Sequence, residues 1–242
     1  MMKEQARKKL FFALDVDDMQ KAARWVERLK GRIGGFKVGK QLFTACGPEV
    51  VKMIRAAGSE VFLDLKYHDI PNTVAGASLE AARLQVKMFN VHALGGREMM
   101  TAAVSALKGY DGGTRPLLLA VTVLTSMHAE ALHEVGMELE RGVLVPHLAR
   151  LAQDCGVDGV VASPREIESI RRVCGPDFLI VTPGVRLANA GADDQKRVAT
   201  PAEAVRAGAD FLVVGRPIAQ ASDPESAAEA IVEEMAGAVA EC

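Results

Sequence analysis

The chain has 242 residues, of which 49 % are hydrophobic and only 5 % aromatic, so it can form a large core built mainly from Ala, Val and Leu. A formal net charge of −2 gives no indication of a nucleic-acid partner, and no run approaches the ~18 apolar residues of a membrane span. The four cysteines form neither a C-x-x-C pair nor a Cys/His zinc pattern. We therefore expect a cytoplasmic protein with reduced thiols, no bound metal, and no membrane or nucleic-acid partner.

Short apolar runs rich in Val, Leu and Phe recur along the whole chain, and we interpret each as a strand buried on both faces. They occupy residues 10–16, 34–39, 60–66, 87–93, 116–124, 158–163, 178–184 and 211–216.

Segments with helical spacing separate these runs. In residues 18–31, Met19, Val26 and Leu29 share one apolar face, and Gly31 marks the stop. Residues 47–58 repeat the pattern. The segment 163–175 opens with Ser163 as a helix cap and Pro164 at the first helical position. A last helix is expected at about residues 224–240.

Alternation of strands and helices predicts an α/β fold with parallel strands and right-handed crossovers. Eight strand–helix units in 242 residues match the count and length of a (β/α)8 TIM barrel, which we expect to form a single domain over residues 1–242. A doubly wound open sheet is the alternative.

Polar residues collect where the predicted strands end, which is where barrels of this kind place their active sites. Asp64 and Lys66 are two residues apart and should face the barrel interior, whereas Leu63 and Leu65 should face the helices. Lys37, between two apolar neighbours, should also face inward. Interior charges need partners, and these can pair with one another. An ion-pair lattice filling one end of the barrel would give the same pattern.

The loops after the seventh and eighth strands predict a phosphate site. Gly215 lets backbone N–H groups approach a ligand, and Pro217 can open a helix whose N-terminus favours an anion. Arg186 and Arg216 can grip phosphate oxygens with forked hydrogen bonds.

Together these motifs resemble the orotidine 5′-phosphate decarboxylase family in its bacterial form. The resemblance runs from end to end, through "ALDV", "FKVG", "DLKYHDIPNT", "VTVLTS", "VTPGVR", "DDQKRVATP" and "VVGRPI". The spacing D-x-K-x-x-D alone is less specific, because related sugar-phosphate barrels carry it. "DLKYHDIPNT" together with "DDQKRV" is specific to the family.

The resemblance implies cofactor-independent decarboxylation of orotidine 5′-phosphate to UMP and CO₂, the last step of de novo pyrimidine nucleotide synthesis. Lys37, Asp64, Lys66 and Asp69 would form a charge network at the reacting carbon, with Lys66 stabilising and protonating the C6 carbanion. The protein would be a homodimer in which Asp69 and Thr73 cross into the partner's site.

The remaining substrate contacts follow from the same resemblance. Ribose would be bound by Asp15 and by Lys37, which would also hold Asp64 in place. Asp64 would contact the substrate by lying against its departing carboxylate, and Thr125 and Ser126 would meet the pyrimidine edge. The loop after the seventh strand is a lid candidate that would close over the phosphate. The other residues expected to bind substrate are Thr73, Pro183, Arg186, Gln195, Gly215 and Arg216.

Two other functions remain open. A metal-dependent sugar-phosphate decarboxylase or aldolase-like synthase could use the same barrel, but Lys37 stands where an acidic metal ligand would be useful. A non-catalytic sensor of phosphoribosyl ligands would have no need of a buried lysine beside a carboxylate. Activity that persists in EDTA would argue against the metal-dependent enzyme. Turnover of substrate would argue against the non-catalytic sensor.

Overall fold

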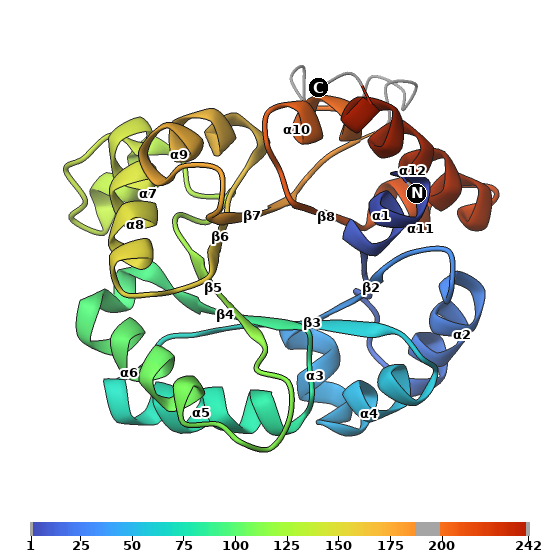
Figure 1. The fold of residues 1–242 in the computed structure, drawn as a ribbon, viewed down its shortest axis with the longest axis horizontal. Coiled ribbons are helices and arrows are strands. Elements are labelled where there is room, and N and C mark those ends of the chain that lie inside the picture. The colour runs from blue at the N-terminus through green and yellow to red at the C-terminus, as the bar shows by residue number, and fades with distance from the viewer. Residues whose placement is uncertain (1, 187–198, 241–242) are drawn as a thin grey trace.

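Eight parallel strands close into a barrel in the computed structural model of the chain, which describes residues 2–186 and 199–240 (Figure 1). Each strand pairs with the next along the chain, and β1 also pairs with β8, where Leu10 lies opposite Leu212. The TIM-barrel prediction is therefore confirmed, and the open sheet is excluded. The strands are β1 (Leu10–Ala13), β2 (Gly35–Gly39), β3 (Glu60–Tyr67), β4 (Met88–His92), β5 (Leu117–Val121), β6 (Gly159–Val161), β7 (Leu179–Pro183) and β8 (Phe211–Val214).

Helices form the outer ring around this barrel (Figure 1). They are α1 (Met2–Lys9), α2 (Met19–Leu29), α3 (Lys40–Cys46), α4 (Glu49–Ala56), α5 (Pro71–Arg83), α6 (Gly96–Lys108), α7 (Ala129–Glu134), α8 (Arg141–Asp154), α9 (Ile167–Cys174), α10 (Pro201–Arg206), α11 (Arg216–Ala219) and α12 (Pro224–Ala240), with short 3₁₀ turns η1 (Ala93–Gly95) and η2 (Pro164–Glu166). Among the described helices, none is long and apolar enough to cross a membrane.

The helix starts follow local capping chemistry. Asp18 caps α2 by accepting a hydrogen bond of 2.8 Å from the Lys21 N–H. The segment expected to be one helix from Ser163 instead begins with the 3₁₀ turn η2. There Glu166 reaches back to the Ser163 N–H at 2.8 Å and closes a capping box.

The helix α1 precedes the first strand and lies outside the predicted strand–helix units. The segment that forms α1 is strongly charged, and Ala6 is its buried apolar residue, so it shows no apolar stripe. It is held against α12, and Lys3 pairs with Glu233 at 2.6 Å (Figure 1). The two ends of the described chain therefore pack side by side and complete the ring.

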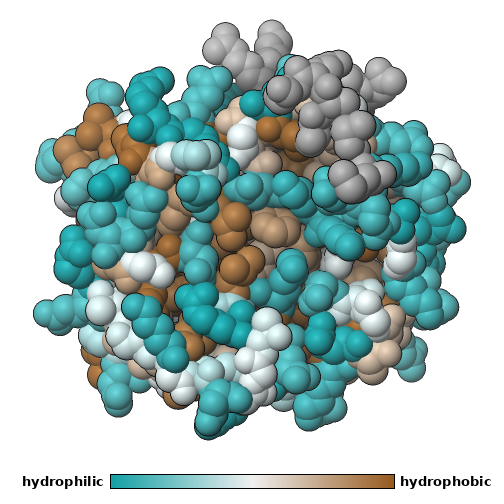
Figure 2. Space-filling view, viewed as in Figure 1, coloured by the Kyte–Doolittle hydropathy of each residue, from teal (hydrophilic) through white to brown (hydrophobic). Residues whose placement is uncertain are grey.

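Apolar side chains form two layers, which fixes where the site can be. The larger layer fills the space between barrel and helices and includes Phe36, Leu63 and Phe89. The smaller layer plugs the barrel interior and includes Phe11 and Phe62. Seen from the side shown in Figure 2, the surface is mostly hydrophilic over the helices, with apolar side chains toward the middle. The barrel is thus a packed core, and its open space lies beyond this plug.

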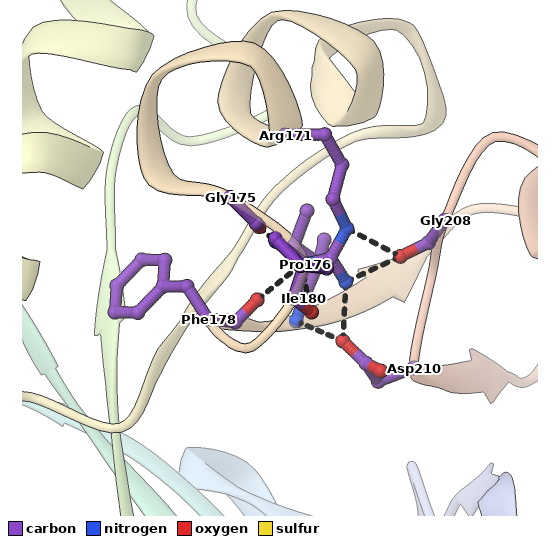
Figure 3. A network of polar contacts seen from close by, with 7 residues as sticks. All are labelled: Arg171, Gly175, Pro176, Phe178, Ile180, Gly208 and Asp210. Carbon is purple, nitrogen blue, oxygen red and sulfur yellow. Dashed lines mark hydrogen bonds and ion pairs between the residues drawn. The ribbon is translucent and has the colours of Figure 1, made fainter.

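A largely buried arginine joins the last two strands (Figure 3). Arg171 on α9 donates to the Gly208 carbonyl at 2.6 Å and to Asp210 Oδ2 at 2.6 Å. The same Asp210 oxygen accepts from the Ile180 N–H at 2.8 Å, so one carboxylate ties β7 to the start of β8. The guanidinium also donates to the carbonyls of Gly175, Pro176 and Phe178.

Candidate active site

A cavity of about 290 Å³ opens at the C-terminal ends of the strands. Its polar lining consists of residues that the sequence predicts to lie there: Lys37, Asp64, Lys66, Thr125 and Ser126, with Pro183 beside them. The apolar wall is supplied by Phe62, Val121, Val123, Leu124, Val161, Ala162 and Val213. The cavity therefore has a charged side built from β2 and β3, and its apolar wall comes from β5 to β8 and from Phe62 of β3.

Two lysines flank one carboxylate on the charged side. Lys66 Nζ lies 2.5 Å from Asp64 Oδ1, and Lys37 Nζ lies 3.4 Å from Asp64 Oδ2. The three side chains are only 12 to 24 % exposed, so water screens these charges weakly. Both oxygens of Asp64 are thus occupied by ammonium groups, and the predicted inward direction of all three residues is confirmed.

Asp15 extends the network toward solvent. Its Oδ1 lies 3.1 Å from Lys37 Nζ, and its side chain is 65 % exposed. Gly215 comes close to the same place, because a Cβ at this position would meet the Ala13 Cβ at 3.3 Å and Asp15 Oδ2 at 3.9 Å. A glycine here therefore leaves the approach to Asp15 open.

Lys66 has an unusual backbone for a strand residue. Its φ is +53°, in the left-handed region that costs a non-glycine residue roughly 1–2 kcal/mol. The pairing of β3 with β4 shifts register at this point, between Leu63 and Tyr67. An observed backbone strain beside paired charges is typical of functional sites.

Asn90 is the site residue that sequence reasoning missed. It is fully buried on β4, donates from Nδ2 to Asp64 Oδ1 at 2.7 Å, and accepts from the Lys66 N–H at 2.7 Å. The sequence contains one indication of this role, because Asn90 is a polar residue within the apolar run "KMFNVHA". A buried amide needs hydrogen-bond partners.

The loop that carries Thr125 and Ser126 is held from behind. Arg141 donates to the Met127 carbonyl at 3.0 Å and to Glu166 Oε1 at 2.6 Å. Glu166 is 8 % exposed, and it also closes the capping box of the next unit. The loop after β5 and the turn η2 are therefore fixed to each other through Arg141.

Several predicted site residues lie outside the cavity wall of this single chain. Asp69 and Thr73 are exposed, and Asp69 Oδ1 accepts from the neighbouring Ile70 N–H at 2.6 Å. Arg216 is exposed at the start of α11, and Pro217 follows in the first turn of this helix, as predicted. Arg186 is half-buried.

The ends of the lid candidate can be placed only in part. The Arg186 N–H donates to the Ala199 carbonyl at 3.2 Å, which brings residues 186 and 199 together. Gln195 lies outside the described residues, so its predicted contact with the phosphate stays a prediction.

His92 lies at the end of β4, two residues after Asn90, and its ring is 5.5 Å from that of His68. Burial, together with the nearby positive charges of His68, Lys40 and Lys66, lowers the pKa of His92 to about 4. Its Nδ1 is buried without a hydrogen-bond partner among the described residues. His92 is therefore a neutral group at neutral pH.

The donor set does not resemble a metal centre. Within residues 2–186 and 199–240, no three His, Cys, Asp or Glu side chains are grouped to hold an ion. Asp64, the carboxylate nearest the cavity floor, already carries two lysines, whose positive charges would oppose a divalent cation.

Fold and site together define an enzyme of the (β/α)8 barrel class, with the charged residues of its cavity on β2 and β3. The family model described as "Orotidine 5'-phosphate decarboxylase / HUMPS family" matches residues 8–231. The chain belongs to this family.

Similar proteins cover nearly its whole length. It is 63 % identical to orotidine 5′-phosphate decarboxylase of Geobacter sulfurreducens, over 98 % of this chain and 100 % of the relative. It is 61 % identical to the protein of the same name from Syntrophotalea carbinolica, over 98 % of each. The crystal structure of orotidine 5′-phosphate decarboxylase from Lactobacillus acidophilus matches with a TM-score of 0.84 and 39 % identity, over 93 % of this chain and 98 % of that one.

Proposed function

We propose that this protein decarboxylates orotidine 5′-phosphate to UMP and CO₂, without a cofactor, as the last step of de novo pyrimidine nucleotide synthesis. The observation that carries the proposal is the row Lys37, Asp64 and Lys66 opposite the apolar wall of the cavity. Relatives at about 60 % identity bear the name of this activity. Family membership alone would not choose the reaction, because the family description pairs two names.

The chemistry requires fixed positive charge. Loss of CO₂ from C6 of the pyrimidine leaves an electron pair in the plane of the ring, where no ordinary resonance acceptor can take it. An ammonium group held close to C6 stabilises that carbanion and requires little reorganisation during the reaction. In this proposal Lys66 takes this role, and its Nζ then donates a proton to C6, so that UMP forms and the lysine is left neutral until it regains a proton from water.

Asp64 has two roles in this proposal. It holds the Lys66 ammonium at 2.5 Å, and we expect the departing carboxylate of the substrate to lie against it. Repulsion between the two carboxylates would be relieved as CO₂ leaves. Lys37 balances the charge of Asp64 and, with Asp15, offers hydrogen bonds to the ribose hydroxyls.

The remaining lining fits the rest of the nucleotide. Thr125 and Ser126 stand at the mouth and can meet the polar edge of the pyrimidine, while Pro183 and the valines of the wall can cover its faces. Arg186, Gln195, Gly215 and Arg216 would bind the phosphate. Energy from that remote contact can be used to close the site over the reacting carbon.

A homodimer completes the proposal. Asp69, Thr73 and the 67 % exposed Ile70 lie on the outside of the chain, where a second copy could cover them. The Asp69 carboxylate would then join the partner's charge network. Mixing inactive Lys66→Ala and Asp69→Ala proteins tests this, because re-assorted dimers would regain one intact site. A mixture that stays inactive after subunit exchange contradicts it.

We also place the protein in the cytoplasm. Cys46, Cys155 and Cys174 are free thiols, which fits a reducing compartment.

The test of the activity is the absorbance change when purified protein meets orotidine 5′-phosphate in EDTA. Conversion to UMP would support both the reaction and its independence of a divalent metal. Folded protein without turnover would instead favour the metal-dependent sugar-phosphate enzymes, and the assay would then be repeated with Mg²⁺ and a sugar phosphate.

A further inference from the structure

Asn90 is a neutral side chain in the middle of a charged site, and both of its polar atoms are used on the neighbouring strand. Its Nδ2 donates to Asp64 Oδ1 at 2.7 Å, and its Oδ1 accepts from the Lys66 N–H at 2.7 Å. It is fully buried, so water does not compete for either bond. One side chain thus contacts both residues that the proposed reaction needs most.

The strand register explains why a side chain is needed here. Leu63 lies opposite Phe89, and Tyr67 lies opposite Val91. Between these pairs, residues 64, 65 and 66 of β3 therefore face the single residue Asn90 of β4. A regular backbone ladder cannot continue through this mismatch, and the Asn90 side chain supplies an acceptor to the backbone of Lys66.

This hydrogen bond also fixes an unfavourable backbone conformation. Lys66 has a φ of +53°, and the bond from its N–H to Asn90 Oδ1 holds it at the point where the register shifts. The position of the Lys66 backbone is thereby fixed. The Lys66 ammonium group donates to Asp64 Oδ1, the same oxygen that accepts a hydrogen bond from Asn90 Nδ2.

Other residue types could do only part of this. Aspartate has nearly the same size and can accept from Lys66, but its carboxylate would repel Asp64 where the amide donates. Alanine would remove the acceptor of the Lys66 N–H and one donor to Asp64 Oδ1. Lost hydrogen bonds are costly in a buried place such as this one.

We propose that Asn90 is a positioning residue for the proposed decarboxylation: it holds the Lys66 backbone and the Asp64 carboxylate so that the Lys66 ammonium stays at the reacting carbon. The inference rests on the proposed function. It predicts that Asn90 affects the chemical step more than the binding of the nucleotide, whose proposed phosphate and ribose contacts lie on other strands.

The experiment compares Asn90→Ala and Asn90→Asp with wild type, using kcat and KM for orotidine 5′-phosphate and the Kd for UMP. We expect kcat to fall by about 10- to 100-fold, the range that small misplacements of reacting groups produce. The Kd for UMP should stay within about threefold of wild type. Aspartate should be no better than alanine, although it fills the same volume.

Thr182→Val is the matched control. Thr182 is also a fully buried polar residue within a barrel strand, and its Oγ1 has no hydrogen-bond partner among the described residues. It is not among the residues that line the cavity. The control should keep the kcat of wild type, which separates the loss of a buried polar group in general from the loss of Asn90.

Three results would overturn the proposal. One is a kcat within about twofold of wild type in folded Asn90→Ala, and another is normal turnover in Asn90→Asp, which would reduce Asn90 to a space-filling residue. The third is failure of both variants to fold or bind UMP, which would make Asn90 a residue of general stability. If only the alanine variant fails to fold, the aspartate variant decides. Lack of turnover by wild type would overturn the proposed function itself, and this inference with it.

Discussion

Lys66 and Asp64 are two residues apart on one strand, yet the lysine ammonium returns to within 2.5 Å of the Asp64 carboxylate. A regular strand would direct both side chains to the same side but would not require a positive φ at Lys66. The positive φ occurs where the pairing of β3 with β4 shifts register, and the hydrogen bond from the Lys66 N–H to Asn90 Oδ1 stabilises it. The distortion of the barrel thus coincides with its group of interior charges.

Removal of Arg216 should weaken phosphate binding selectively. In Arg216→Ala we expect the Kd for UMP to rise by roughly 10- to 100-fold, because hydrogen bonds to charged groups contribute about 1.5–3 kcal/mol. Uridine, which lacks the phosphate, is the control ligand, and its affinity should not change. Equal losses for the two ligands, measured by calorimetry, would remove Arg216 from the phosphate site.

Removal of Arg171 should destabilise the fold without affecting the chemistry. Its guanidinium is 18 % exposed and donates to Asp210 and to several carbonyls, none of them from residues that line the cavity (Figure 3). Arg171→Ala should lower the free energy of unfolding by about 3 kcal/mol and the Tm by roughly 6–12 °C. The kcat below the transition should be that of wild type.

Arg150→Ala is the control for this experiment. Arg150 also bonds a carbonyl and a carboxylate near α9, but its side chain is 58 % exposed. Its removal should change the free energy of unfolding by no more than about 0.5 kcal/mol. Similar Tm values for the two variants would show that the Arg171 network is not a special source of stability.

His92 should make the folded state sensitive to acid. Its pKa is about 4 in the folded protein, against an ordinary value of 6.5, so the unfolded chain binds the proton first as pH falls. Its contribution to stability is therefore complete above pH 6.5 and is lost progressively between pH 6.5 and 4. Thermal melts at pH 7.5 and 5.0 should show a smaller drop in Tm for His92→Asn than for wild type. Identical drops would exclude His92 as a source of this dependence.

Much of the fold could be predicted from periodicity. The eight apolar runs correspond to the eight strands, and the segments 18–31, 47–58 and 224–240 contain α2, α4 and α12. The alternation around Asp64 and Lys66 placed both charges inside the barrel, because Leu63 packs on the helices. Strand alternation is a local property, and it predicts the inward direction of both side chains, although the register shift at Lys66 interrupts the regular strand.

Other features depend on contacts that a single segment does not encode. The φ of Lys66 and the role of Asn90 arise from the register between β3 and β4, which the sequence of neither strand specifies. The helix α1 is held by α12 from the other end of the chain. Asp69 and Thr73 are exposed here, and their predicted place in a partner's site depends on a second copy.

Lys66→Ala is the most direct test of the central claim, that a preorganised lysine stabilises and protonates the C6 carbanion. We predict a folded protein, by circular dichroism, that still binds UMP but shows no measurable turnover of orotidine 5′-phosphate. Near-normal turnover in this variant would contradict the account, because the reaction would then proceed without the Lys66 ammonium at the reacting carbon.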